Sequence, residues 1–125
     1  MRFMLYGLLI LFSIEASALE VEGEFFVGQG EDEITVIGTS EYARVQPVFA
    51  GFVGSQKAVR VRYLQMSSRD IDQAVRSGLS ADIDLVMSSA VDLQVRLVND
   101  GFARPLDQGL TRHLNWRGEL IQLSV

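Results

Sequence analysis

Three loops rich in small hydroxyl residues are the parts of this sequence best suited to binding chemistry. Each lies where an apolar run gives way to a helical pattern: Thr39-Ser40, Met66-Ser67-Ser68 and Ser88-Ser89-Ala90. A helix N-terminus carries unpaired N–H groups and a partial positive charge, so such loops suit a carboxylate, a phosphate or a bound synergistic anion. Hydroxyl groups add donors of their own. The same residues are also ordinary helix caps, so the residues alone leave binding and capping both open.

The other polar residues do not form a catalytic set. His113 is the only histidine, whereas metal sites recruit several ligands, and there is no cysteine. Asp82 and Asp84 are two apart and share a strand face, where acid–base chemistry is less expected than solvation at the start of the strand. We therefore expect no enzymatic activity, no cofactor and no metal site. The net charge of −5 argues against nucleic acid or anionic lipid as a partner.

A strand–helix pattern would bring the three loops together. Apolar runs typical of strands occur at Ile34–Ile37, Val59–Leu64 and Ile83–Met87, each followed by a helical pattern. Such repeats form βαβ units, so the sequence predicts one α/β domain with a parallel sheet in the flavodoxin-like order 2-1-3 and flanking helices. Ligands bind such sheets at the carboxyl ends of the strands, where the three loops would lie.

The helices have recognisable starts and ends. The first is expected from about Arg44 to Gly54, with Pro47 in its first turn. Capping boxes at Ser67–Asp70 and Ser89–Asp92 predict the second helix, ending at Gly78, and the third, ending at Gly101. The flanking segments are less regular, and the elements expected there are an acidic lead-in with a short edge strand at Phe25–Val27, a short helix at Leu110–Trp116 and a strand-like run at Leu120–Val125.

Residues 1–18 have the composition of a secretion signal. Arg2 supplies a positive start, Phe3–Ile14 is almost wholly apolar, and Ala16-Ser17-Ala18 matches the small-x-small pattern of a cleavage site. The apolar run holds about a dozen residues, whereas a bilayer span needs ~20. We therefore expect a signal peptide, a mature chain that begins at Leu19 in the periplasm, and no membrane anchor after cleavage.

One long segment and three short ones resemble a known family. Asp82–Ala103 is similar to part of the type 2 periplasmic solute-binding proteins of ABC importers, and more narrowly to their iron(III)-type and phosphoglycerate-transport regulatory branch. Thr35–Ser40, Pro47–Phe52 and Val61–Ser68 resemble the family's first strand and ligand loop, its first helix, and its second strand and loop. The order and spacing of these segments match along nearly the whole expected mature chain.

The resemblance implies the fold of a first lobe, with a ligand at the carboxyl edge of its sheet. It favours Ser40, Ser88 and Ser89 as ligand contacts, beside Thr39, Ser67 and Ala90. Family members have a second lobe, in which iron-binding members place two adjacent tyrosines, whereas Tyr6, Tyr42 and Tyr63 are far apart in this sequence. We therefore expect residues 19–125 to form an incomplete solute-binding domain.

Three functions remain open from the sequence. The resemblance implies a periplasmic substrate-binding component of an ABC transporter, which would take a small anionic solute or chelated iron to a permease. The regulatory branch of the family also allows a sensing protein that presents its ligand to the sensor kinase of a two-component system. A truncated product without binding function is the third alternative.

Overall fold

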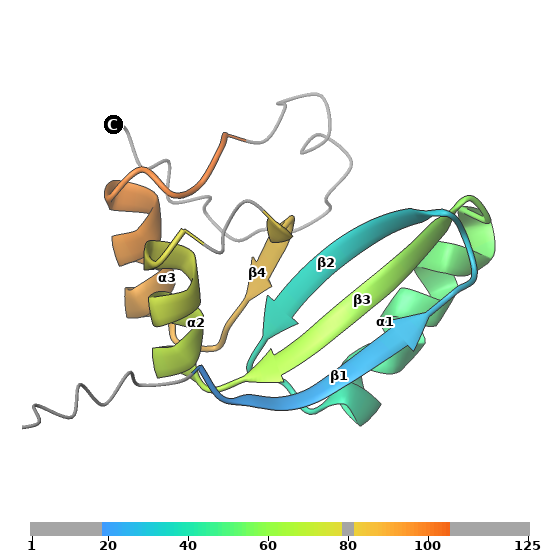
Figure 1. Ribbon diagram of the computed structural model, residues 1–125, viewed down its shortest axis with the longest axis horizontal. Coiled ribbons are helices and arrows are strands. Elements are labelled where there is room, and N and C mark those ends of the chain that lie inside the picture. The colour runs from blue at the N-terminus through green and yellow to red at the C-terminus, as the bar shows by residue number, and fades with distance from the viewer. Residues whose placement is uncertain (1–18, 79–81, 106–125) are drawn as a thin grey trace, which may run out of the picture.

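The computed structural model describes residues 19–78 and 82–105, and the strands and helices of this part confirm the α/β class (Figure 1). The strands are β1 (Val21–Val27), β2 (Asp32–Gly38), β3 (Val59–Met66) and β4 (Leu85–Met87). The helices are α1 (Tyr42–Ser55), α2 (Ser68–Arg76) and α3 (Val91–Asn99). The expected signal peptide and the elements expected at Leu110–Trp116 and Leu120–Val125 lie outside the described residues.

The sheet is mixed, with the strand order β1-β3-β2-β4. β2 pairs in parallel with β3, where Val36 lies opposite Tyr63, and with β4, where Ile37 lies opposite Val86. These three strands have the predicted 2-1-3 order. The expectation of a wholly parallel sheet is wrong, because β1 pairs antiparallel with β3 at the outer edge.

β1 is longer and more regular than the acidic lead-in expected before Phe25. Its side chains alternate between the two faces of the sheet, as they must in a strand. The Glu24 carboxylate accepts a hydrogen bond from Arg62 Nε on β3 at 2.6 Å. The Phe25 ring turns to the opposite face and stacks on the Tyr42 ring, with centroids 4.0 Å apart. Glu24 therefore belongs to a regular strand, in which side chains alternate between the two faces, and not to an irregular segment.

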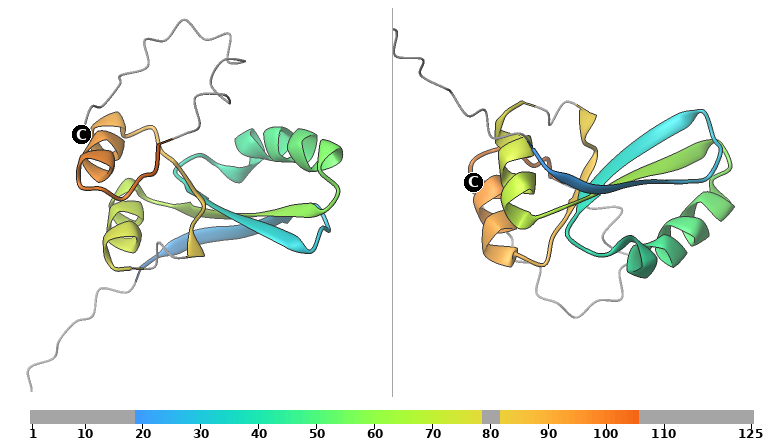
Figure 2. Two further views of the ribbon diagram at one scale, coloured as in Figure 1. Left: turned by 90° about the horizontal axis from the view of Figure 1, so that it is seen from above. Right: turned by 60° about the horizontal axis from the view of Figure 1, so that its bottom comes forward.

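Helices cover both faces of the sheet (Figures 1 and 2). α1 packs on the face that carries Val36, Val61 and Tyr63. α2 and α3 pack on the other face, over Ile37 and Met66. Val36 and Ile37 are adjacent and are 2% and 1% exposed, so β2 is buried on both sides. Burial of such a side chain contributes roughly 1.5–3 kcal/mol, so β2, one of the two inner strands, contributes to the core on both faces of the sheet.

α1 starts earlier than the sequence predicts. It begins at Tyr42 rather than near Arg44, so Pro47 lies inside the helix and not in its first turn. The Pro47 ring is exposed, and the helix continues past it to Ser55 beyond the expected end at Gly54. Proline lacks the N–H that would bond to the carbonyl one turn back, but on the solvent side that carbonyl can bond to water.

α2 agrees with its prediction. Ser67 is its N-cap, and Ile71, Ala74 and Val75 are all buried. The helix gives way to Gly78, which has a φ of 86° that favours glycine. In α3 only Leu97 is buried, and Val91 at the start of the helix is 62% exposed.

The C-terminal ends of α2 and α3 are tied together. Arg76 of α2 pairs with Asp100 at 2.7 Å, and its guanidinium carbon lies 5.5 Å from the centroid of the Phe102 ring. Gly101 ends α3 at a φ of 85°, and the Phe102 N–H donates to the Leu97 carbonyl at 3.0 Å, as in a Schellman motif. Within residues 19–78 and 82–105, no helix has the length and apolar character needed to cross a bilayer.

Candidate functional site

The parallel strands place the three hydroxyl-rich loops at one edge of the sheet. β2, β3 and β4 run in the same direction, and each is followed by one of these loops and then by a helix. The six residues predicted as ligand contacts all lie in these loops: Thr39 and Ser40 after β2, Ser67 after β3, and Ser88, Ser89 and Ala90 after β4.

The loops after β2 and β4 are in direct contact. The Thr39 N–H donates to the Met87 carbonyl at 3.1 Å, which continues the pairing of the two strands by one more bond. The Ser89 N–H then donates to Thr39 Oγ1 at 3.3 Å. Thr39, Ser88 and Ser89 are therefore brought together by the fold. The Thr39 hydroxyl hydrogen stays available as a donor, because its oxygen is the acceptor in this contact.

The start of α3 differs from the predicted capping box. The N-cap is Ala90, which makes no side-chain cap bond, and the box expected at Ser89–Asp92 is wrong. Instead, Ser88 Oγ accepts the Ala90 N–H at 3.1 Å, and the Val91 N–H donates to the Ser89 carbonyl at 3.1 Å. These amides are already paired within the chain. A ligand at this edge would therefore meet hydroxyl groups before it met these backbone donors.

Ser67 serves α2. Its Oγ accepts the Asp70 N–H at 3.2 Å and donates to Asp70 Oδ2 at 2.6 Å. The hydroxyl thus has a partner both as donor and as acceptor, which is the capping alternative that the sequence left open.

Two residues of β3 support the loop after β2, although neither was predicted to be part of the site. The Tyr63 hydroxyl donates to the Ser40 carbonyl at 2.6 Å, and the Tyr42 N–H donates to Gln65 Oε1 at 3.0 Å. Burial raises the pKa of the Tyr63 hydroxyl because it disfavours the phenolate. The only feature of the sequence that indicates this support is a tyrosine at a buried strand position, because a buried hydroxyl needs a hydrogen-bond partner.

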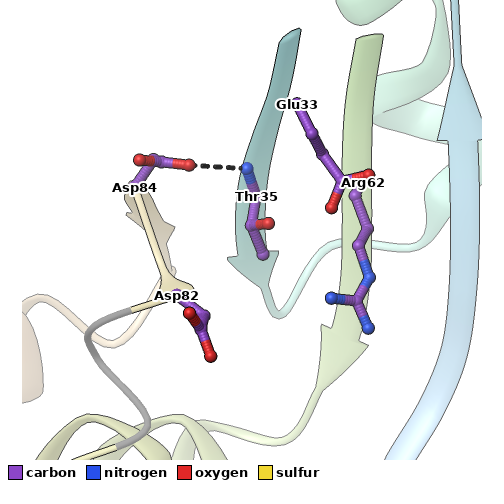
Figure 3. A pocket seen from close by; sticks show the side chains of 5 residues that line it. All are labelled: Glu33, Thr35, Arg62, Asp82 and Asp84. Atoms are coloured by element: carbon purple, nitrogen blue, oxygen red, sulfur yellow. Dashed lines mark hydrogen bonds between the residues drawn. The ribbon is translucent and has the colours of Figure 1, made fainter. Parts of the chain in front are cut away.

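A polar hollow of about 360 Å³ lies elsewhere on the sheet, bordered by Glu33, Thr35, Arg62, Asp82 and Asp84 (Figure 3). Asp84 has a structural role there, since its carboxylate accepts the Thr35 N–H at 2.8 Å and its own N–H donates to the Thr35 carbonyl at 2.9 Å. This finding replaces the solvation role expected for Asp84. Among the described residues, no three His, Cys, Asp or Glu side chains are grouped to hold a metal ion.

The fold resembles that of a known transport protein. The crystal structure of the substrate binding protein of an ABC transporter from Agrobacterium tumefaciens matches 77% of this chain with a TM-score of 0.67 and 22% sequence identity. The match spans 30% of the length of that chain. No family model and no curated protein match the sequence. The described residues therefore resemble part of that substrate binding protein in fold.

Proposed function

We propose that this chain is a periplasmic substrate-binding component of an ABC importer, and that residues 19–125 correspond to the first lobe of such a protein. The observation that carries the proposal is the likeness of fold to part of an ABC transporter's substrate binding protein. The contact between Thr39 and Ser89 supports it, because it joins two loops at the sheet edge where ligands of α/β folds bind.

The proposed ligand is a small anionic solute or a chelated iron ion. It would lie across the Thr39–Ser40 and Ser88–Ala90 loops, with Ser67 at the margin. The hydroxyl groups at these loops can donate to anionic oxygens, and the helix N-termini contribute a favourable field. Affinity would be modest with one lobe, because closure of a second lobe excludes water and completes the contacts.

The proposed partner is an ABC permease. A sensor kinase of a two-component system is the alternative partner, and both roles would use the same ligand site. Genes for a permease and an ATPase beside this one would support import, whereas a histidine kinase and a response regulator would support sensing.

Calorimetric titration tests the ligand site. Inorganic phosphate, citrate and iron(III) citrate are titrated into the wild type and into Ser89→Asp, in which a carboxylate should repel an anion from the exposed loop position. Ser55→Asp is the matched control, since it makes the same change at the far end of α1. We expect binding to wild type and to Ser55→Asp but not to Ser89→Asp. Binding to none of the three proteins would overturn the anion-binding function, and equal binding to all would move the site elsewhere.

A further inference from the structure

A buried residue beneath the candidate site contacts it through a short hydrogen bond. Tyr63 is 0% exposed, and its ring packs against Phe49, with centroids 5.4 Å apart, inside the core under α1. Its hydroxyl nevertheless reaches out of this core to the Ser40 carbonyl, at 2.6 Å. A buried hydroxyl without a partner is costly, so this bond fixes the Ser40 carbonyl on the core side of the loop.

β2 leaves space for this contact. Gly38 is the last residue of β2, and a Cβ atom on it would sit 2.6 Å from Tyr63 Oη and 3.0 Å from the Met87 carbonyl oxygen. Any larger residue would displace the tyrosine hydroxyl or the neighbouring strand. Gly38 and Tyr63 therefore act together to keep the loop in place.

The direction of the Ser40 carbonyl determines the direction of the next amide. In a trans peptide the C=O and the following N–H point to opposite sides, and the described residues contain no cis peptide. Because the Ser40 carbonyl points inward to Tyr63, the Glu41 N–H points away from the core. The following amide, that of Tyr42, is held by Gln65 Oε1 at 3.0 Å and is not available in the same way.

We propose that Tyr63 is a positioning residue for the ligand site, and that its hydroxyl orients the Ser40–Glu41 peptide so that the Glu41 N–H faces the ligand. The expected effect of Tyr63 on ligand binding rests on the proposed function. The structural consequence, the orientation of one peptide group, holds without any ligand. Tyr63 itself stays covered and touches no solute.

The test compares Tyr63→Phe with Tyr42→Phe. Both variants lose one phenolic oxygen from adjacent rings of one aromatic stack, whose centroids are 6.4 Å apart, but only Tyr63 bonds to Ser40. NMR spectra of the purified protein without ligand report on the loop through the Ser40 carbonyl shift and the Glu41 amide shift. Titration with inorganic phosphate and with citrate then reports on binding. Chemical denaturation of all three proteins shows whether either substitution lowers the free energy of unfolding.

In Tyr63→Phe we expect changed chemical shifts at Ser40 and Glu41. We also expect anion affinity to fall by about five- to tenfold, because the loss of one hydrogen bond changes a dissociation constant by about that factor. Tyr42→Phe should bind as the wild type does. Unchanged loop shifts in folded Tyr63→Phe, or unchanged affinity, would overturn the proposal. If the wild type binds neither anion, titration with iron(III) citrate decides the proposed function, and the ligand-free shifts still decide whether Tyr63 orients the peptide.

Discussion

At the scale of single residues, serines that look alike in the sequence have different roles. Ser67 caps α2 through the Asp70 N–H, whereas Ser89 makes no cap bond to α3 and is exposed. The sequence shows the same serine-rich pattern before both helices. The difference arises because α3 has its N-cap one residue later, at Ala90, while the Ser89 N–H donates to Thr39 Oγ1.

Alanine substitutions should separate these roles. Ser67→Ala removes a side-chain cap and should lower the free energy of unfolding by about 1 kcal/mol. Ser89→Ala removes an exposed hydroxyl without a cap bond and should change it by less than about 0.5 kcal/mol. Urea denaturation followed by circular dichroism measures both. Equal losses in the two variants would mean that Ser89 caps α3 in solution.

The buried Tyr63 hydroxyl should make stability depend on alkaline pH. Its pKa is raised above the ordinary 10.0 by burial, so the unfolded chain releases this proton before the folded one does. The resulting stability is fully present below about pH 10 and is lost as the pH rises toward the folded-state pKa. Unfolding curves from pH 8 to pH 11 should show a steeper decline for wild type than for Tyr63→Phe. Parallel declines would show that other groups dominate.

At the scale of secondary-structure elements, β4 is held to β2 by a neighbouring side chain in addition to its short backbone pairing. It has only 3 residues, and the Asp84 carboxylate supplies an additional bond to the Thr35 N–H of β2. Thr35 is 6% exposed, so its amide would have poor access to water if that bond were lost. Asp84 therefore helps to anchor the strand that carries Ser88 and Ser89.

Substitutions at Asp84 test this anchor. Asp84→Ala should destabilise the protein by about 1–3 kcal/mol, because it leaves a buried donor unpaired. Asp84→Asn keeps a carbonyl oxygen and should recover part of the loss. Asp82→Ala, at an exposed position beside the same hollow, is the control and should stay within about 0.5 kcal/mol of wild type. A loss in Asp82→Ala as large as in Asp84→Ala would contradict the specific role of Asp84.

Two glycines allow a matched test of packing. Gly38→Ala would place a Cβ 2.6 Å from Tyr63 Oη, so we expect a loss of about 1–3 kcal/mol. Gly51 lies in α1 with nothing within 4 Å of its Cβ position, so Gly51→Ala should stabilise the helix by about 0.5–1 kcal/mol. Denaturation midpoints measure both changes. If Gly38→Ala were as stable as wild type, the close approach of Tyr63 would not constrain β2.

The sequence predicts most of the elements but not the contacts between them. Strand and helix patterns locate β2, β3, β4 and α2, since each depends on a local pattern of apolar residues. β1 was predicted only in part, because Gly23 and Phe26 interrupt its alternation of polar and apolar residues and its partner β3 is distant in sequence. The six loop residues follow from the βαβ pattern. The support from Tyr63 and Gln65 does not, because each contacts a residue 23 positions away.

At the scale of the whole molecule, the mixed sheet explains how the N-terminal segment joins the fold. β1 covers the outer edge of β3, so the parallel strands are extended on the side away from β4. Leu19, just before β1, packs against the core under α2. The fold therefore uses the chain from the first residue after the expected cleavage site, and cleavage before Leu19 would leave every described element in place.

This arrangement leads to a prediction about export. Processing after Ala18 should release a folded protein into the periplasm, and mass spectrometry of that fraction should give a chain that begins at Leu19. Ala18→Leu places a bulky residue where a signal peptidase needs a small one, so the variant should stay unprocessed in the membrane fraction. Glu20→Gln, on the other side of the site, is the control and should be processed normally. A wild-type chain that retains Met1 would show that residues 1–18 are not a cleaved signal, and a start beyond Leu19 would remove a side chain that the α2 core uses.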